Sequence, residues 1–484
     1  MKQLFIKSVF GLLVLLQVTA CTRTFDEMNT NPNNPVTAPA TNILARSIQA
    51  TAGTLYGERL GMYYLGAYGG QTSVRSVGAF YEYRAEIVLS HWTSLYQIMN
   101  DLQKVILQSE KDNNKNMQAA AITLKAFVAQ YVTDMWGDVP YSDALKGEDG
   151  VIQPAYDTQE AIYNSLLAEL KKAADLFNEG AIDKLGDGDI LMSNNTGKWK
   201  RFCNSLRLRV AMRMSYAAPA VATAALKEVL TNAASYPVLQ QDENVSLQWL
   251  GTAPYNEPWY EFLRTRTDYA MNATLIDVLN NYADPRLPVY ALPAADDGLY
   301  HGLITGRPGS EFTLNNVSRI GTKFAGTANG LSPFMRYSEV CFIMAEAYQR
   351  NLVTGNAADA YVKGITASMA ENGITNISTY LNDPKVALAG NNGDLQKINL
   401  QKWIALFKQS AEAWSEARRT DVPLMAKVPY DYNGSHNRPP FRYPYPEEEL
   451  FLNEKNIKPH MEGLENNDKY WGKQVWWDKR SNVH

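Results

Sequence analysis

The sequence predicts a fold dominated by α-helices that pack as stacked antiparallel pairs, with a loop-rich insertion and little β-structure. Several segments repeat apolar residues at three- and four-residue steps, the spacing that gives a helix one apolar face. The links between the first of these segments are short, so consecutive helices should lie side by side in opposite directions. A composition of 45% apolar and 20% charged residues over 484 residues is typical of a globular chain.

Five amphipathic helices are expected before residue 236. Apolar residues recur at helical spacing over residues 92–106 and again over 117–135. The second helix should end near Trp136, because Gly137 can take the left-handed cap conformation and Pro140 prevents continuation. The other three are expected from the variant capping box Asp157-Thr158-Gln159-Glu160, from about Lys198, and over residues 221–234.

Residues 236–330 differ from the helical segments on both sides. Pro, Gly, Asn and Tyr are common there, and helical spacing is patchy. Val245, Leu247 and Trp249 alternate with polar residues, as in a half-buried strand. We expect a loop-rich insertion with this strand and one helix near residues 270–282.

Helices are expected to return at Ser332-Pro333, a favourable N-cap and first-turn pair. Further helical patterns cover residues 356–372 and 395–419. After Pro423 no long apolar period remains, so we expect a tail that wraps the surface and is ordered by its aromatic residues. The predicted regions are 41–235 (N-terminal helical repeats), 236–330 (insertion) and 331–484 (C-terminal helices and tail), with 21–484 forming one unit.

The N-terminus indicates a secreted lipoprotein. Lys2 and Lys7 accompany an apolar stretch, and small residues lead directly to Cys21. Such a head, residues 1–20, is typical of a signal peptide, and Cys21 at its end resembles a bacterial lipobox, whose Cys is acylated. The alternative is an ordinary cleaved signal with a chance Cys. We expect lipid attachment at Cys21, an extended tether over residues 21–40, and no further membrane span, since no other apolar run reaches 18 residues.

Composition and motifs exclude several kinds of function. Acidic residues outnumber basic ones by 50 to 46, which argues against a nucleic-acid binder. The five His are not paired at metal spacing, and no Walker loop, dinucleotide fingerprint or nucleophile elbow is present. No catalytic residue, metal site or cofactor is therefore predicted. Cys203 and Cys341 lie in apolar helical patterns and are interpreted as buried small hydrophobic residues, although a disulfide between them stays open.

Acidic residues offer two weak signals. Asp134 and Asp138 are four residues apart, a spacing that could serve acid–base chemistry or calcium binding. We interpret Asp138 instead as part of the turn that follows the helix. Structural calcium could also bind the acidic loops at residues 183–189 or at Asp296-Asp297, but neither matches an EF-hand loop.

Two aromatic clusters are the stronger functional signal. Tyr and Trp rings combine an apolar face with a polar edge, and this chain has 28 Tyr and 10 Trp. Such faces can stack on sugar rings while amide and guanidinium groups bond to hydroxyls, and the same set can hold peptides. Alternatively, the rings hold long loops against the helical body. The candidate ligand-binding residues are Tyr68, Gln71, Arg75, Tyr81 and Tyr83 in the first cluster, and Tyr255, Asn256, Trp259, Tyr260 and Arg266 in the second.

Five separated motifs resemble those of one family, the SusD/RagB outer-membrane nutrient-binding lipoproteins. Each is weak alone, but their order and the lipobox make the resemblance specific along the whole chain. They are the Asn- and Pro-rich residues 29–35, the turn Trp136-Gly137-Asp138-Val139-Pro140-Tyr141-Ser142-Asp143-Ala144, the segment Arg336-Tyr337-Ser338-Glu339-Val340 with Ala345-Glu346-Ala347, the residues 401–420 with Trp414 and Arg418-Arg419, and the C-terminal Arg442-Tyr443-Pro444 with Val475-Trp476-Trp477-Asp478. We interpret Arg336, Glu339, Glu346, Arg418 and Arg419 as buried or capping ion pairs rather than ligand contacts.

The resemblance implies a fold of tetratricopeptide-like helix pairs in a superhelix and a binding role without catalysis. Members of the family form a lid on a SusC-like TonB-dependent barrel and capture oligosaccharides, or peptides in RagB-like proteins. It implies an outer-membrane protein anchored through the acyl chains of Cys21, and Asp26-Glu27 resembles a surface-export signal of related lipoproteins. Two alternatives stay open: an envelope scaffold built from similar helices, and a surface glycoside hydrolase, which would need two carboxylates facing one cleft.

Overall fold

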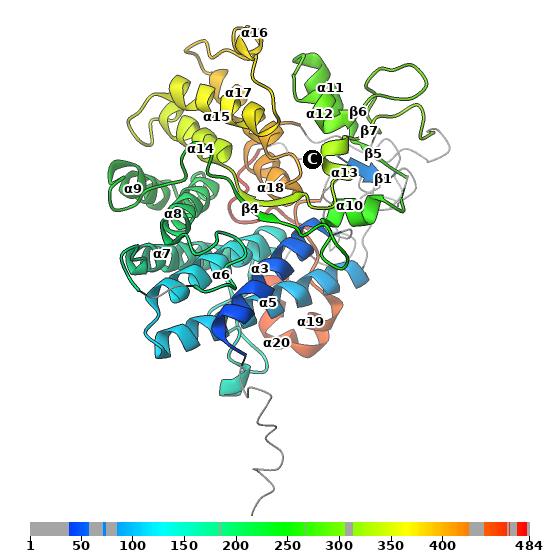
Figure 1. Cartoon of the computed structure of the whole chain (residues 1–484). Coiled ribbons are helices and arrows are strands. Elements are labelled where there is room, and N and C mark those ends of the chain that lie inside the picture. Colours follow the sequence, from blue (N-terminus) through cyan, green and yellow to red (C-terminus); the bar gives the residue numbers. More distant parts are fainter. Residues whose placement is uncertain are drawn as a thin grey trace, which may run out of the picture.

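The computed structural model describes residues 38–57, 71–73, 85–182, 185–266, 268–304, 313–424, 440–461, 464 and 472–481. Within these ranges helices dominate, and strands occur in short two-stranded pairs, as the helical periodicity predicts (Figure 1). The signal peptide, Cys21 and most of the tether lie outside the described residues.

The first half of the described chain is a stack of long helices. Each consecutive pair from α5 to α9 packs together, and α3 lies against α5. All five predicted helices are present, with α5 extending beyond the predicted residues 92–106 at both ends, and α3 is a further helix that was not predicted. The bounds are α3 (Ala40–Tyr56), α5 (Ala85–Lys111), α6 (Lys115–Trp136), α7 (Gln159–Leu176), α8 (Thr196–Arg213) and α9 (Pro219–Thr231).

Local signals set the ends of α6 and α7. The Asn114 side chain accepts a hydrogen bond from Met117 N at the start of α6, and that of Thr158 accepts one from Ala161 N at the start of α7. Helix α6 ends at Trp136 as predicted. Gly137 has φ 78° and ψ −120°, so its φ is positive but its conformation is not the left-handed helical one that we expected. Only glycine adopts this region readily.

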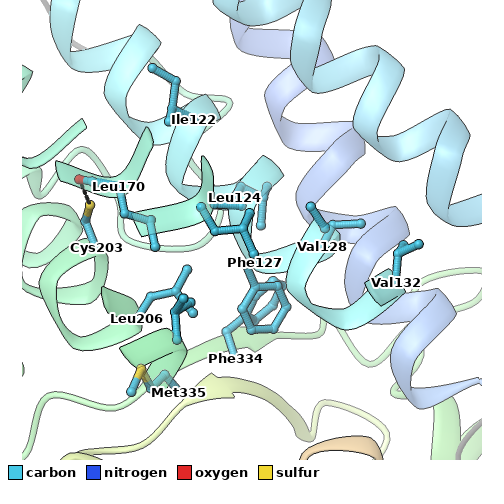
Figure 2. Packing of buried hydrophobic residues seen from close by; sticks show 14 of the residues in the cluster. Ile122, Leu124, Phe127, Val128, Val132, Leu170, Cys203, Leu206, Phe334 and Met335 are labelled. Atoms are coloured by element: carbon cyan, nitrogen blue, oxygen red, sulfur yellow. Dashed lines mark hydrogen bonds between the residues drawn. The ribbon is translucent and has the colours of Figure 1, made fainter. Parts of the chain in front are cut away.

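The main hydrophobic core lies among these helices and reaches into the second half of the chain. Phe127 of α6 packs against Phe334, with ring centroids 5.2 Å apart (Figure 2). It also packs against Phe202 of α8, with ring centroids 6.2 Å apart. The thiol of Cys203 donates to Leu170 O at 3.2 Å in the same core. Cys203 and Cys341 are both buried and free, which confirms their interpretation as small hydrophobic residues.

The second half of the described chain contains more helices, and the first of them begins later than predicted. Ser332-Pro333 lies in a strand, not at a helix start, because residues 331–335 pair with the predicted strand at residues 245–248. The next helix follows only after Arg336. The bounds are α14 (Tyr337–Gln349), α15 (Ala357–Glu371), α16 (Ser378–Leu381), α17 (Asp394–Ala405), α18 (Ser410–Thr420), α19 (Glu447–Leu452) and α20 (Glu454–Ile457).

Residues 395–419 are largely helical, as predicted. They form two helices, α17 and α18, separated at residues 406–409. Lys408 in this link has φ 74°, which an α-helix cannot contain. The Arg336 guanidinium holds the break, because Nη1 donates to the carbonyl oxygens of Ala405 and Phe407, both at 3.0 Å.

Short elements fill the region between α9 and α14, at the right of Figure 1. The helix expected near residues 270–282 is preceded by a strand and is shorter than predicted. A second core here joins these elements to α17 and α18. The elements are β4 (Val245–Gln248), α10 (Pro258–Leu263), β5 (Tyr269–Met271), α11 (Ala273–Asn281), α12 (Leu287–Tyr290), β6 (Ala291–Leu292), β7 (Arg319–Ile320), α13 (Thr322–Ala325) and β8 (Leu331–Met335).

Strand pairing connects segments that are distant in sequence. The antiparallel pairs are β4 with β8, β6 with β7, β1 (Gln71–Ser73) with β5, and β2 (Val139–Pro140) with β3 (Tyr156–Asp157). The described part of the tail does more than wrap the surface. Tyr443, Tyr445 and Trp477 are buried in the main core, where Trp477 Nε1 donates to Asp134 Oδ1 at 2.8 Å.

Charged residues of the family-like motifs form buried contacts, as interpreted from the sequence. Arg419 bonds both carboxylate oxygens of Glu346, at 2.7 and 2.5 Å, and Glu339 pairs with Arg209 at 2.6 Å. Burial by itself raises the pKa of Glu346, and the adjacent Arg419 overcomes this effect and lowers it. Arg418 differs, since it donates to main-chain carbonyls and the Ser415 hydroxyl, and burial lowers its pKa to about 9.

Candidate ligand-binding groove

Strand pairing connects Gln71, the one described candidate of the first aromatic cluster, to the strand that follows the second cluster. Gln71 of the first cluster lies in β1 opposite Met271, and Ser73 lies opposite Tyr269. The second cluster occupies the residues just before β5. Of the first cluster, Tyr68, Arg75, Tyr81 and Tyr83 lie outside the described residues, and only the backbone of Gln71 is described. The pairing therefore places Gln71 beside the strand that follows the second cluster.

Helix α10 displays the second cluster, and its local sequence explains why it forms. The Glu257 side chain caps the helix by accepting from Tyr260 N at 3.0 Å, and Pro258 occupies the first turn. Glu257 is itself fully buried, and its Oε1 lies 3.0 Å from Lys408 Nζ. The start of α10 is therefore tied to the link between α17 and α18.

A groove of about 650 Å³ separates α10 and the preceding loop from α3. This volume lies in the range of about 300–1,000 Å³ that is typical of ligand pockets. Its walls combine apolar surfaces with amide, carboxylate and guanidinium groups, the mixture that sugar rings and their hydroxyls require. The lining residues are Arg46, Gln49, Ala50 and Gly53 of α3, and Trp249, Pro254, Asn256, Pro258, Glu261, Phe262 and Thr265 opposite them.

A short polar chain runs along the α10 side of this groove. Asn256 Nδ2 donates to Glu261 Oε2 at 2.8 Å, and Arg264 Nη2 donates to Glu261 Oε1 at 2.5 Å. The hydrogen bond from Arg264, followed by that from Asn256, lowers the pKa of Glu261. Glu261 is thus a charged acceptor at neutral pH, and a ligand hydroxyl can donate to it.

The predicted residues of the second cluster occupy different environments. Tyr255 is 43% exposed beside the groove, Asn256 lines it, and Tyr260 is partly exposed. Arg266 makes two hydrogen bonds to the Asp268 carboxylate, at 2.7 and 2.6 Å. Trp259 is fully buried and packs edge-on against Phe407 at 5.9 Å, so its ring stabilises the second core and presents no face to a ligand.

The sequence reasoning missed the α3 wall. Arg46, Gln49 or Ala50, and Gly53 recur at three- and four-residue steps and so share one helix face. Ala50 and Gly53 on that face are small and leave room beside the helix. Their spacing is the signal in the sequence that could have indicated this wall of the groove. Trp249 was predicted only as a strand residue, although it also lines the groove.

Neither acidic signal coincides with the groove. Asp134 is buried, accepts from the Tyr163 hydroxyl and from Trp477 Nε1, and lies 3.6 Å from Arg213 Nε. Burial raises its pKa to about 6 against the opposing effect of Arg213. Asp138 accepts from Gln159 N at 2.8 Å and contacts His460 at 2.8 Å, so it shapes the turn after α6, as interpreted.

The described part of the acidic loops has no metal-binding arrangement. The Asp189 carboxylate accepts hydrogen bonds from Met192 N, Asn194 N and Trp199 Nε1. Its role is therefore to hold the loop. Among the residues that the structure describes, no group of three or more His, Cys, Asp and Glu side chains is placed to hold a metal ion. Within the same ranges, no helix has both the length and the apolar character needed to cross a membrane.

Comparisons with known proteins agree with this architecture. A chitin-binding protein of known structure is 28% identical, with a TM-score of 0.80 over 91% of this chain and 100% of that one. A SusD homolog from Bacteroides uniformis is 25% identical, with a TM-score of 0.77 over 90% and 99% of the two chains. A chitin-binding SusD homolog from Flavobacterium johnsoniae, 24% identical, has the same fold, with a TM-score of 0.78 over 92% and 99% of the two chains.

The family comparison covers most of the chain. No curated protein matches the sequence. Residues 32–446 match the family model SusD-like_2, described as "Starch-binding associating with outer membrane". The helix-dominated fold predicted from the sequence is the fold of the solved SusD homologs. The chain therefore belongs to the SusD-like family.

Proposed function

We propose that this protein captures an oligosaccharide at the cell surface and delivers it, as a lid, to a SusC-like TonB-dependent transporter. The single observation that carries the proposal is the groove between α3 and α10, whose size and mixed apolar and polar walls fit a short glycan. Family membership supports a glycan ligand, because the family is described as starch-binding and the 28% identical structure is a chitin-binding protein.

Anchoring completes the proposed role. Acylation of Cys21 holds the protein on the outer membrane, and the tether of residues 21–40 leaves it free to move against its partner. Capture on a tethered lid raises the ligand concentration at the barrel mouth, which requires no new contact with the barrel. Weak, reversible binding is sufficient for such a step.

The proposal assigns binding and no catalysis. Glycoside hydrolysis needs two carboxylates on opposite sides of one scissile bond. In the described part of the groove the lining carboxylate is Glu261, which is held by Asn256 and Arg264. Asp134 and Asp138 are held by different partners away from the groove.

A ligand screen tests the groove. The full chain in detergent is titrated calorimetrically with chitin oligosaccharides, maltooligosaccharides and a pool of short peptides. We expect a glycan to bind, and Gln49→Ala and Asn256→Ala each to weaken binding about five- to tenfold through loss of one hydrogen bond. Asn42→Ala, an exposed amide on α3 outside the groove lining, is the matched control and should leave affinity unchanged.

Other outcomes favour the alternatives. Binding of peptides and of no glycan would replace the glycan with a peptide ligand, as in RagB-like proteins. Turnover of a glycan would favour the hydrolase, and a groove without affinity for any oligomer would favour the scaffold.

The partner and the anchor need a separate experiment. A C-terminally tagged chain is purified from solubilised outer membranes, and the co-purifying proteins are identified by mass spectrometry. We expect a stoichiometric TonB-dependent barrel and an acylated Cys21. A Cys21→Ser chain should lose membrane attachment, whereas reproducible absence of a barrel from the correctly acylated protein would contradict the lid role.

A further inference from the structure

A second cavity, of about 340 Å³, shares no lining residue with the groove. It lies between the β4–β8 pair, α13 and the link that separates α17 from α18. Its size is within the range of about 300–1,000 Å³ for small-molecule sites. Its lining includes cationic, amide and aromatic side chains, namely Gln248, Lys323, Phe324, Asn329, Arg336 and Lys408.

The break between α17 and α18 places cationic groups at this cavity. Lys408 has φ 74°, a conformation that costs energy in a non-glycine residue and that tends to persist at functional sites. Its side chain is 3% exposed, and Nζ donates to Leu331 O at 2.6 Å and lies 3.0 Å from Glu257 Oε1. An uninterrupted helix would not put Lys408 at this position.

Positive charge exceeds negative charge around the cavity. Arg336 Nε pairs with Glu371 at 2.9 Å, and Lys408 pairs with Glu257. Lys323 instead donates to two neutral oxygens, the Glu371 carbonyl at 2.6 Å and Asn372 Oδ1 at 3.0 Å. Three cations therefore face two carboxylates.

One donor group of Arg336 at the cavity is not used by the contacts within the protein. The Arg336 side chain is 7% exposed, and its Nε and Nη1 groups bond Glu371, two carbonyls and Gln409. Its Nη2 group makes no hydrogen bond to a described residue. Partial desolvation of Lys323 and near-complete burial of Lys408 lower the pKa of each ammonium group, so an entering anion would stabilise their charged forms.

We propose that this cavity binds one acidic sugar unit, with the carboxylate of a hexuronate between Lys323 and Arg336. Guanidinium and ammonium donors form strong charge-assisted bonds to a carboxylate. Phe324 supplies an aromatic edge for the ring, and Gln248 and Asn329 supply amide groups for its hydroxyls. The inference goes beyond the groove function, because it concerns a separate site and holds whichever glycan or peptide the groove takes.

Calorimetric titration of the full chain in detergent with glucuronate and with glucose tests the site. We expect glucuronate to bind at least about tenfold more tightly than glucose, the value of one charge-assisted hydrogen bond. Lys323→Gln should weaken glucuronate binding about tenfold, and Lys323→Arg should retain it within about threefold. Lys323 is exposed enough for both variants to fold.

Lys385→Gln is the matched control. Lys385 Nζ also donates to a carbonyl and an amide oxygen, both of Asn281, at 2.8 and 3.3 Å, but it does not line the cavity. Equal effects of Lys323→Gln and Lys385→Gln on glucuronate binding would overturn the proposal, as would equal affinity for glucose and glucuronate. Tighter binding of an acetylated dipeptide carboxylate would also overturn it, in favour of a peptide terminus. Asn256→Ala should leave glucuronate binding unchanged, which separates this test from that of the groove.

Discussion

The helical body from α5 to α9 and the loop-rich part from β4 to β8 are held together in different ways. In the body, each helix packs on its neighbour in sequence. In the loop-rich part, contacts join distant segments: β1 pairs with β5, and Trp259 packs on Phe407. The body is therefore assembled largely from local contacts, whereas the groove and the cavity depend on long-range ones.

The two parts also differ in their charged contacts. Where the body meets α14 and α18, Arg213, Glu346, Glu416 and Arg419 form a buried network. Beside the groove, the pair of Arg264 with Glu261 is exposed to solvent. Buried pairs are costly to break, because the remaining charge loses its partner without regaining water, while exposed pairs contribute little. Substitutions of charged residues should therefore affect stability in the body, whereas at the groove they should affect ligand binding.

The largest effect is expected from Arg419→Met. Removal of the guanidinium leaves Glu346 and Glu416 buried without their closest cation. The free energy of unfolding should fall by about 3–5 kcal/mol, measured by urea denaturation. Lys146→Met breaks an exposed pair with Asp143 and should leave the urea midpoint unchanged. Similar midpoints for the two variants would mean that the buried network does not stabilise the body.

Trp259→Ala tests whether the loop-rich part can loosen by itself. Loss of this fully buried ring should lower the free energy of unfolding by about 3 kcal/mol. Amide exchange should accelerate in α10, α11 and α13 and stay slow in α6 and α7, and groove binding should weaken. Phe127→Ala, in the main core, should instead accelerate exchange in α6 and α8. Uniform acceleration by Trp259→Ala would show that the two cores unfold as one unit.

A smaller effect is expected at the turn that follows α6. Gly137 has φ 78°, and a Cβ there would lie 3.1 Å from Arg442 Nη1 and 3.6 Å from Val475 Cγ1. Gly137→Ala should therefore lower the free energy of unfolding by about 1–3 kcal/mol through backbone strain. Gly147→Ala is the control, since a Cβ at Gly147 meets no atom within 4 Å and its backbone φ is not positive. Equal thermal midpoints for the two variants would contradict the strain argument.

The difference between the two parts explains what the sequence could predict. Helical spacing and caps such as Thr158 are local, so the helices of the body were predicted closely. Ser332-Pro333 has a good local preference for a helix start, but pairing with β4 overrides it. Nothing local marks the break at Lys408, which depends on Arg336 bonding the carbonyls at the end of α17.

The candidate site shows the same limit. Chemical character is visible in sequence, and it made Tyr255 and Asn256 candidates for ligand binding. Asn256 lines the groove, and Tyr255 is exposed at the preceding position. Trp259 has the same character but is buried by Phe407, a residue far along the chain. The α3 wall, with Arg46 and Gln49, was missed because its role depends on which loop faces it.

The smallest effect, about 1 kcal/mol, concerns the pH dependence of stability in the body. Burial raises the pKa of Asp134 to about 6 from 3.8, and the folded state therefore takes up a proton more readily than the unfolded state. The stabilisation from this proton is complete below pH 3.8 and is lost as the pH rises through 6. Between pH 5 and pH 7, Asp134 should thus lower the free energy of unfolding by about 1 kcal/mol.

Asp134→Asn isolates this contribution, because an amide does not titrate in this range and its oxygen can still accept from Trp477 Nε1. The free energy of unfolding is measured by urea denaturation at pH 5 and at pH 7. The change in this free energy between the two pH values should be about 1 kcal/mol smaller for the variant than for the wild type. Asp143→Asn, an exposed carboxylate, is the control and should behave as the wild type. Parallel pH profiles for wild type and Asp134→Asn would mean that Arg213 and the Tyr163 hydroxyl keep Asp134 ionised in spite of its burial, and the body would then owe none of its pH dependence to this carboxylate.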